Sequence, residues 1–284
     1  MTVMVEISKL KKMVDDFQLG PIDVNIEPGT ITAIVGNNGS GKSTLLKLIM
    51  HQATADTGYI SVHNKPVAGR DESWKHHIAY LPQTVIGYDP FTGNTLKELI
   101  STLYPNWDEK LFVKLIEAFN VPMNKNFSKL SQGVQQKLNL ALTIPRNTRV
   151  LLLDEPTAFM DIPSKKYLMD ILVDWMDQDG RTIVITSHQA EDIKKLADDV
   201  LVLQDGNMIG NFAKETLTES YRRYWLSEKL QQAKIPGEIA REHQQLISNQ
   251  PEATEQFFRD NNIEWVEHTA LDLEEVISLL SQKR

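Results

Sequence analysis

The sequence contains no cysteine among its 284 residues. This absence excludes disulfide bonds, thiolate metal ligands and cysteine nucleophiles, and it is compatible with a reducing cytosol. Long apolar runs are lacking too, since no stretch approaches the roughly 18 uninterrupted apolar residues that a membrane-spanning helix needs. The first residues, MTVMVEISKLKKM, lack the apolar run of a signal peptide. We therefore expect a cytoplasmic protein with no part embedded in a membrane.

Basic residues are also fewer than acidic residues. The chain has 30 Lys and Arg residues against 38 Asp and Glu residues, a formal net charge of −8. A dedicated nucleic-acid-binding protein usually carries a basic face, so we expect no nucleic-acid partner. The patch 221–224, with its adjacent arginines, leaves that alternative open locally. Hydrophobic residues make up 41% and charged residues 24%, which is ordinary for a globular protein.

Several short and fully apolar runs alternate with helical patterns along the first two thirds of the chain. The runs are Ile31–Val35, Ile78–Leu81, Val150–Leu153, Thr182–Thr186 and Val200–Leu203. Such runs are typical of buried parallel strands, and the helices between them of crossover connections. Ile22, Val24 and Ile26 instead alternate with polar residues, which indicates an antiparallel addition. The predicted fold class is α/β.

No comparable strand pattern lies between Asp89 and Arg146. Three segments there have helical spacing, namely Thr95–Leu103, Glu109–Phe119 and Gln135–Thr143. The sequence therefore predicts a helical subdomain at about 89–146, inserted into an α/β domain that covers residues 1–213.

The remainder, residues 214–284, has a more polar texture with few strand signals. Leu217, Tyr221, Tyr224 and Trp225 follow helical spacing, and 269–276 has the pattern of a capped amphipathic helix. We predict a mainly helical extension, whose apolar residues pack on the core or on another subunit. Leu271, Val276, Leu279 and Leu280 are the residues that suggest such docking.

A glycine-rich loop connects the predicted strand at 31–35 to a helix that begins near Ser43. The loop fits the pattern G-x-x-x-x-G-K-[ST], and its residues are Gly36, Asn37, Asn38, Gly39, Ser40, Gly41, Lys42 and Ser43. The glycines permit a tight loop whose N–H groups approach a polyphosphate, and the helix N-terminus that follows favours negative charge. Lys42 would reach the β- and γ-phosphates and Ser43 would bind Mg²⁺. The alternative is a glycine turn that opens an ordinary helix.

Asp154 and Glu155 directly follow the apolar run 150–153. Ligands bind at the carboxyl ends of strands in open α/β sheets, so both carboxylates are expected beside the phosphate loop. Asp154 would hold Mg²⁺, and Glu155 would act as general base on the attacking water. Helix capping and simple solvation are the alternatives.

His188 follows the predicted strand at 182–186 and therefore lies at the same edge of the sheet. It is a candidate contact for the γ-phosphate. A structural histidine is the alternative.

Across residues 1 to about 210 the sequence resembles the nucleotide-binding subunits of ABC transporters. Gln83, in Tyr-Leu-Pro-Gln, matches their Q-loop, and 130–137, Leu-Ser-Gln-Gly-Val-Gln-Gln-Lys, matches their signature motif. The resemblance implies ATP and Mg²⁺ as ligands, with Thr44 also at the nucleotide and Gln83 near the metal and the attacking water. It also implies a head-to-tail dimer in which Ser131 and Gly133 contact the nucleotide of the opposite subunit.

Other features of this family are matched or missing. Asp161 takes the place of the D-loop acid at the dimer interface. Gln132 and Val134 replace the glycine and the glutamine that the signature usually contains at these places. No tyrosine occurs in residues 1–35, so Phe17 or Met13 would have to contact the adenine that an aromatic residue usually stacks on.

The run 103–108, Leu-Tyr-Pro-Asn-Trp-Asp, and the form of the signature are similar to a bacterial subgroup of exporter ATPases that includes bacitracin, antimicrobial-peptide and acetoin-operon types. This resemblance implies export through a separate membrane permease docked near 83–91, with the chain peripheral on the inner face of the cell membrane. The second subunit would be an identical or a related chain. The alternatives are a non-transport ABC ATPase that remodels ribosomes or DNA, and a P-loop kinase.

Overall fold

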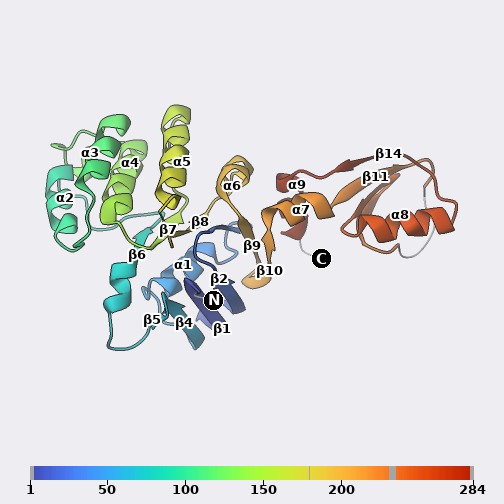
Figure 1. The fold of residues 1–284 in the computed structure, drawn as a ribbon, viewed down its shortest axis with the longest axis horizontal. Helices are drawn as coiled ribbons and strands as arrows, with labels where there is room; N and C mark the ends of the chain where they lie inside the picture. Colours follow the sequence, from blue (N-terminus) through green and yellow to red (C-terminus); the bar gives the residue numbers. More distant parts are fainter. Residues whose placement is uncertain (1–2, 179, 230–234, 282–284) are drawn as a thin grey trace. The chain divides into compact units, whose positions relative to one another are not determined.

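The computed structural model describes residues 3–178, 180–229 and 235–281 (Figure 1). The chain divides into two compact units, Met1–Asn211 and Phe212–Arg284. The sequence had predicted a boundary between residues 213 and 214. Of the described residues, no helix combines the length and the apolar character needed to cross a lipid bilayer.

The first unit is built on a six-stranded sheet with strand order β10-β9-β3-β8-β7-β6. Its strands are β3 (Ile31–Val35), β6 (Ile78–Leu81), β7 (Val150–Asp154), β8 (Thr182–Thr186), β9 (Asp199–Gln204) and β10 (Asn207–Ala213). The five strands from β9 to β6 in this order are parallel to their neighbours. Every residue of β3, β7 and β8 is buried, which explains why apolar residues occupy both faces of these strands rather than alternate positions. The predicted α/β class is confirmed.

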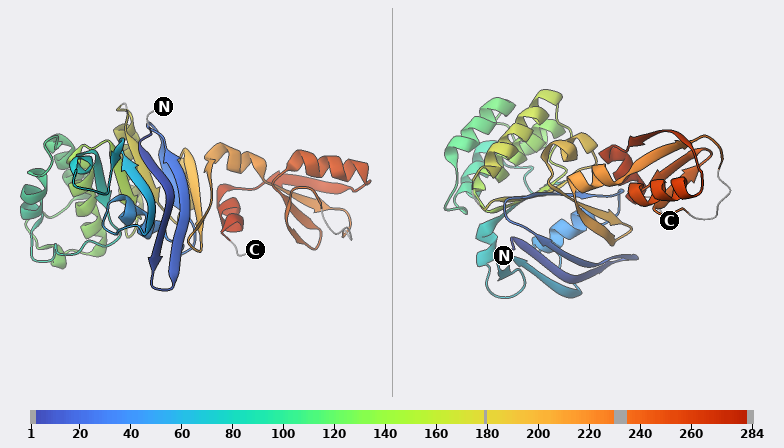
Figure 2. Two further views of the ribbon diagram at one scale, coloured as in Figure 1. Left: turned by 90° about the horizontal axis from the view of Figure 1, so that it is seen from below. Right: turned by 45° about the vertical axis from the view of Figure 1, so that its right-hand side comes forward.

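A second, antiparallel sheet with order β2-β1-β4-β5 packs beside the first. Its strands are β1 (Val5–Val14), β2 (Phe17–Ile26), β4 (Thr57–Val62) and β5 (Lys65–Pro66). Helix α1 (Lys42–Ile49) lies between the two sheets, because its leucines join one hydrophobic core with residues from both (Figure 2). This core fixes the direction of α1 and, with it, the position of the glycine-rich loop at its N-terminus.

Three α-helices group together at one end of this unit (Figure 1): α2 (Gly93–Ser101), α3 (Glu109–Phe119) and α4 (Gln132–Thr143). Short 3₁₀ turns occur at Ser73–His77, Phe127–Lys129 and Ile144–Arg146. The side chain of Asp108 caps α3 and that of Ser131 caps α4. Helices α5 (Ile162–Met176) and α6 (Ala190–Leu196) cover the face of the parallel sheet opposite α1 (Figures 1 and 2).

The second unit corrects the prediction of a mainly helical extension. It contains the antiparallel sheet β12-β13-β11-β14 together with three helices. The strands are β11 (Arg222–Leu226), β12 (Glu238–Glu242), β13 (Gln245–Ser248) and β14 (Trp265–Ala270), and the helices are α7 (Lys214–Ser220), α8 (Pro251–Asp260) and α9 (Leu273–Leu280). Residues 230–234 and 282–284 of the predicted extension lie outside the described residues.

Strand β11 shows why the prediction of a helix at these residues was wrong. Tyr224 and Leu226 are buried while their neighbours are partly exposed, which is the alternation of a strand. The spacing of Leu217, Tyr221 and Tyr224 matched a helix by coincidence, and only pairing with β13 and β14, far along the chain, decides the conformation. The predicted capped helix exists as α9, which begins after an Asp272 capping box, whereas Thr269 belongs to β14.

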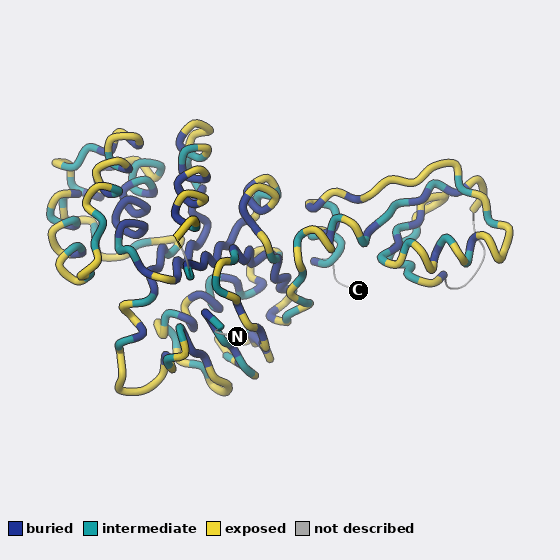
Figure 3. Tube along the Cα trace, in the orientation of Figure 1, coloured by how far each residue is buried: buried dark blue, intermediate teal, exposed yellow. Residues whose placement is uncertain are grey.

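Figure 3 shows the resulting burial, with the central strands buried and the outer helix faces exposed. The second unit has its own small core of Tyr224, Leu226, Ile235, Leu246 and Phe258. Each unit therefore buries apolar surface of its own, as expected of separate compact units.

Candidate functional site

The glycine-rich loop is shaped by its contacts with neighbouring strands. Gly36 has φ 146°, and a Cβ atom there would lie 2.1 Å from the carbonyl oxygen of Leu203, so no other residue fits without moving the backbone. The Nζ atom of Lys42 donates to the carbonyl oxygens of Gly36 at 2.8 Å and Asn37 at 3.1 Å. The ammonium group is thus held over the loop, where the N–H groups of the first helical turn also point.

Lys42 is only 8% exposed. Burial lowers the pKa of Lys42, while the carboxylates of Glu155 and Asp154 act in the opposite direction. A partly desolvated cation beside open N–H donors is suited to bind a multiply charged anion.

One hydroxyl holds the two predicted acids in place. The Oγ1 atom of Thr186 donates to Oδ1 of Asp154 at 2.7 Å, and the N–H of Glu155 donates to the same Oγ1 at 2.9 Å. The three residues lie at the carboxyl ends of the adjacent strands β7 and β8, where sequence reasoning placed the acids. Glu155 has φ 51°, in the left-handed region. Thr186 was missed because nothing in a strand of apolar and β-branched residues distinguishes its hydroxyl.

Glu155 and His188, which the sequence predicted separately at the same edge of the sheet, are in contact in the structure. Nδ1 of His188 lies 2.8 Å from Oε2 of Glu155. The carboxylate is 9% exposed and the imidazole 62% exposed. The histidine therefore faces solvent and contacts the buried carboxylate from its exposed side.

The glycine-rich loop and the two acids border a cavity of about 640 Å³. Its lining residues are Phe17, Asn38, Gly39, Gly41, Lys42, Ser43, Thr44, Gln83, Asp154 and Glu155. The other predicted site residues of this chain's own nucleotide, Gly36, Asn37, Ser40 and His188, are not among them, and Ser40 is buried. The cavity has the size of a small-molecule site with a few convergent polar groups.

The donor set in this cavity fits Mg²⁺ shared with a ligand. In the described part of the chain, no three His, Cys, Asp or Glu side chains converge as a metal cluster. Mg²⁺ keeps several waters and usually takes one or two carboxylates together with phosphate oxygens. The hydroxyl of Ser43, the amide of Gln83 and the carboxylate of Asp154 line the same space and supply such a partial shell of oxygen ligands.

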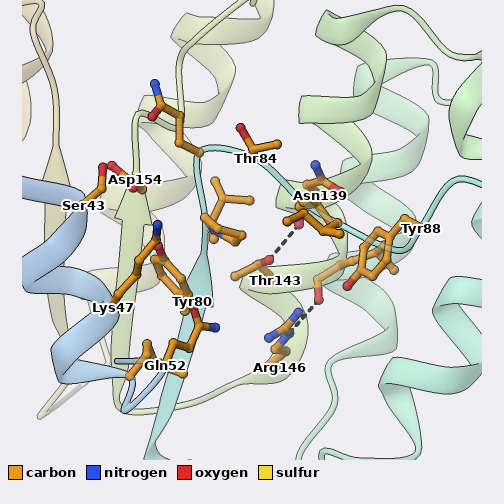
Figure 4. A pocket seen from close by; sticks show the side chains of 17 residues that line it. Ser43, Lys47, Gln52, Tyr80, Thr84, Tyr88, Asn139, Thr143, Arg146 and Asp154 are labelled. Carbon is orange, nitrogen blue, oxygen red and sulfur yellow. Dashed lines mark hydrogen bonds between the residues drawn. The ribbon is translucent and has the colours of Figure 1, made fainter. Parts of the chain in front are cut away.

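A second cavity of about 510 Å³ adjoins the first and shares Ser43, Gln83 and Asp154 with it (Figure 4). It extends between the end of α1, the segment 80–88 and the helices at 139–146. Two of its lining residues, Tyr80 and Asn139, carry buried oxygen atoms without a hydrogen-bond partner in the described structure. Burial is the main cause of the raised pKa of the Tyr80 hydroxyl. Gln83 therefore connects the nucleotide-sized cavity to a groove that reaches the helical subdomain.

The predicted signature residues do not line the cavity of their own chain. Ser131 is exposed and caps α4 by accepting from the N–H of Val134 at 3.4 Å. A Cβ atom at Gly133 would lie 2.6 Å from the carbonyl oxygen of Phe159, so this glycine also has a packing role within its own chain. Sequence reasoning missed that role, because Phe159 approaches only in the folded state.

Phe17, one of two residues considered for contact with a base, lies at the cavity wall. Its ring packs near Gly41 and Gly206, where added Cβ atoms would approach it to 3.1 Å and 3.2 Å. Met13, the other candidate, is 50% exposed and is not among the lining residues.

Comparisons with known proteins agree with this geometry. Residues 19–158 match the family model described as ABC transporter. An ABC transporter ATP-binding protein of Bacillus subtilis, YtrB, is 31% identical over 77% of this chain and 75% of its own length. A petrobactin import ATP-binding protein of Bacillus anthracis, FpuC, is 30% identical over 68% of this chain and 74% of its own.

Among solved structures, one described as the ATP-binding subunit of an ABC transporter superposes with a TM-score of 0.68. At 20% identity it covers 76% of this chain and 92% of its own, and it supports the fold. The glycine-rich loop, the paired acids and the matched family model agree over the same part of the sequence. The chain belongs to the ATP-binding subunits of the ABC transporters and is an ATP hydrolase.

Proposed function

We propose that this chain is the motor of an ABC exporter, in which ATP and Mg²⁺ bind between two such subunits and drive a separate membrane permease. One observation carries the proposal: Lys42, Ser43, Gln83, Asp154 and Glu155 all line a single cavity at the carboxyl edge of the sheet. This is the arrangement that phosphoryl transfer to water requires, namely a cation, metal ligands and a base.

Each residue has a distinct role in this proposal. Lys42 leaves the carbonyl groups of its own loop to bind the β- and γ-phosphates, and the loop N–H groups complete the anion site. Ser43, Asp154 and Gln83 would hold Mg²⁺, which would neutralise phosphate charge. Glu155 takes a proton from the attacking water, which typically contributes 10²- to 10⁴-fold to the rate.

His188 orients Glu155 in the resting site through their 2.8 Å contact. It can then turn its exposed ring toward a γ-phosphate. Phe17 provides a ring at the cavity wall for the base, in place of the tyrosine that the sequence lacks.

The site is completed by a second subunit. Ser131 and Gly133 lie outside the cavity of their own chain, so we assign them to the nucleotide of the partner. Phe159 and Ile162, which flank Asp161, are 67% and 83% exposed. Large apolar side chains at such exposure favour an interface between subunits. An isolated monomer should therefore hydrolyse ATP very slowly.

The second cavity is the proposed docking site for the permease. Ile86, at its rim, is 90% exposed, and Leu99 and Leu103 of the helical subdomain are 53% and 68% exposed. A permease segment that enters this groove would contact Gln83 directly and so couple its movement to the metal site. Binding there would hold the chain on the inner face of the cell membrane. Export, rather than import, is favoured by the residue pattern at 103–108 and by the form of the signature.

Glu155→Gln tests the motor assignment. The variant should bind ATP like the wild type, lose hydrolysis by about 10²-fold or more, and accumulate as an ATP-bound dimer. Size-exclusion chromatography with light scattering, and phosphate release, measure the two effects. Normal hydrolysis by a monomeric variant would refute the assignment.

The permease is tested by purification from native membranes. A polytopic membrane protein should copurify with the wild type and be lost from Ile86→Asp. Recovery of ribosomes or DNA instead would support the non-transport alternative.

A further inference from the structure

One face of α4 packs along the segment 155–161, which begins with the proposed catalytic base Glu155. Gly133, Gln136 and Lys137 are spaced so that they share this face of the helix. Gly133 packs against the carbonyl group of Phe159, and Nζ of Lys137 lies 2.6 Å from Oδ2 of Asp161. The hydrogen bond from Lys137 is the main cause of the lowered pKa of Asp161. The helix that begins at the signature is thus attached to its own chain just beyond Glu155.

Gln136 makes the contact nearest to the chemistry. Its side chain is buried, and Nε2 donates to the carbonyl oxygens of Glu155 at 3.3 Å and Pro156 at 3.0 Å. On the other side, the N–H of Glu155 is bound by Thr186. The left-handed backbone of Glu155 is therefore held between β8, through Thr186, and α4, through Gln136. Its side chain extends from this position to His188.

We propose that Gln136 is a positioning residue that links the two composite sites of the dimer. ATP of the partner subunit, bound against Ser131 and Gly133, fixes the position of α4. Gln136 transmits this position to the backbone of Glu155 through its hydrogen bonds. The inference rests on the proposed function, because it requires Ser131 and Gly133 to act on the partner's nucleotide. Packed helices move as rigid units with discrete arrangements, so a shift at the start of α4 is felt one turn later.

The chain provides a matched control for this residue. Gln135, next to Gln136 on α4, donates its Nε2 to the carbonyl oxygen of Phe127 at 2.9 Å, away from the acids. Gln136→Met and Gln135→Met each keep an unbranched side chain and remove one amide donor. Only Gln136→Met removes a hydrogen bond to the backbone of Glu155.

Steady-state phosphate release over a range of ATP concentrations tests the proposal. Gln136→Met should lower kcat about 10- to 100-fold with little change in KM, and should lower the Hill coefficient for ATP toward that of independent sites. Gln135→Met should keep the kcat and the cooperativity of the wild type. Combined with Glu155→Gln, both methionine variants should still form the ATP dimer, which shows that the partner contacts are intact.

Three results would overturn the proposal: an unchanged kcat in Gln136→Met, equal losses in both variants, or loss of the ATP dimer by Gln136→Met alone. If Gln136→Met does not fold, Gln136→Asn is the substitute, because it keeps the amide on a shorter side chain. Its kcat should also fall, but by less than the kcat of Gln136→Met. A wild-type chain that does not hydrolyse ATP as a dimer would instead refute the proposed function.

Discussion

Replacing Thr186 by valine removes one hydroxyl from a fully buried site and leaves the shape of the side chain almost unchanged. That hydroxyl donates to the carboxylate of Asp154 and accepts from the N–H of Glu155. The substitution therefore tests whether the two acids are held by this single group or by the packing of their strands.

The size of the effect follows from the two bonds. A hydrogen bond to a charged group contributes about 1.5–3 kcal/mol, and a buried N–H left without a partner costs about 1–3 kcal/mol. We expect Thr186→Val to lower the free energy of unfolding by the sum of the two, about 2.5–6 kcal/mol. A base and a metal ligand that are no longer fixed should also lower kcat by at least about 10-fold, since small misplacements of reacting groups are costly.

Thr182, on the same strand, is the matched control. It is also fully buried, but its Oγ1 donates to the carbonyl oxygen of Glu27 at 3.1 Å, far from the acids. Thr182→Val should cost about 1 kcal/mol and leave kcat unchanged. Thr186→Ser keeps the hydroxyl and should recover most of the activity. Urea unfolding and phosphate release at saturating ATP, with a titration of Mg²⁺, measure these quantities.

The reasoning is refuted if Thr186→Val and Thr182→Val have the same kcat and the same Mg²⁺ dependence. Equal loss of activity in Thr186→Ser and Thr186→Val would likewise show that packing, and not the hydroxyl, positions the acids.

Two further predictions concern the histidines at positions 63 and 77 and the ring of Phe17. The rings of His63 and His77 lie 4.8 Å apart. Burial lowers the pKa of both histidines below the ordinary 6.5, and the positive charges of Arg149 and Lys65 act in the same direction. Repulsion from His63 and, to a smaller extent, from His76 lowers the pKa of His77 further. Because the unfolded chain takes up these protons first, the free energy of unfolding should be highest above about pH 6.5 and fall as the pH is lowered below that value. Urea unfolding of His63→Gln should show a weaker fall. Phe17→Ala should weaken ATP binding by about 1–3 kcal/mol but leave the binding of inorganic tripolyphosphate unchanged, as calorimetry can measure; equal weakening of both would assign Phe17 to packing of the loop.

The sequence alone determined the fold class and identified most residues of the proposed nucleotide site. Fully apolar strands such as β7 can only be buried on both faces, so their pattern identifies a parallel sheet before any contact is known. The glycine-rich loop can be predicted from sequence because Gly36 and Lys42 are close along the chain, and their local backbone shapes the proposed anion site. Asp154 and Glu155 could be placed beside them because parallel strands end at one edge.

Tertiary structure alone decided the rest. The strand at Arg222–Leu226 depends on partners found many residues later, so helical spacing gave the wrong answer there. Thr186 and Gln136 have no local signature, since a threonine in a strand or a glutamine on a helix becomes a positioning group only when packing brings the acids within hydrogen-bond distance. Periodicity reveals which face of an element is buried, whereas the partner on that face is chosen by the whole fold.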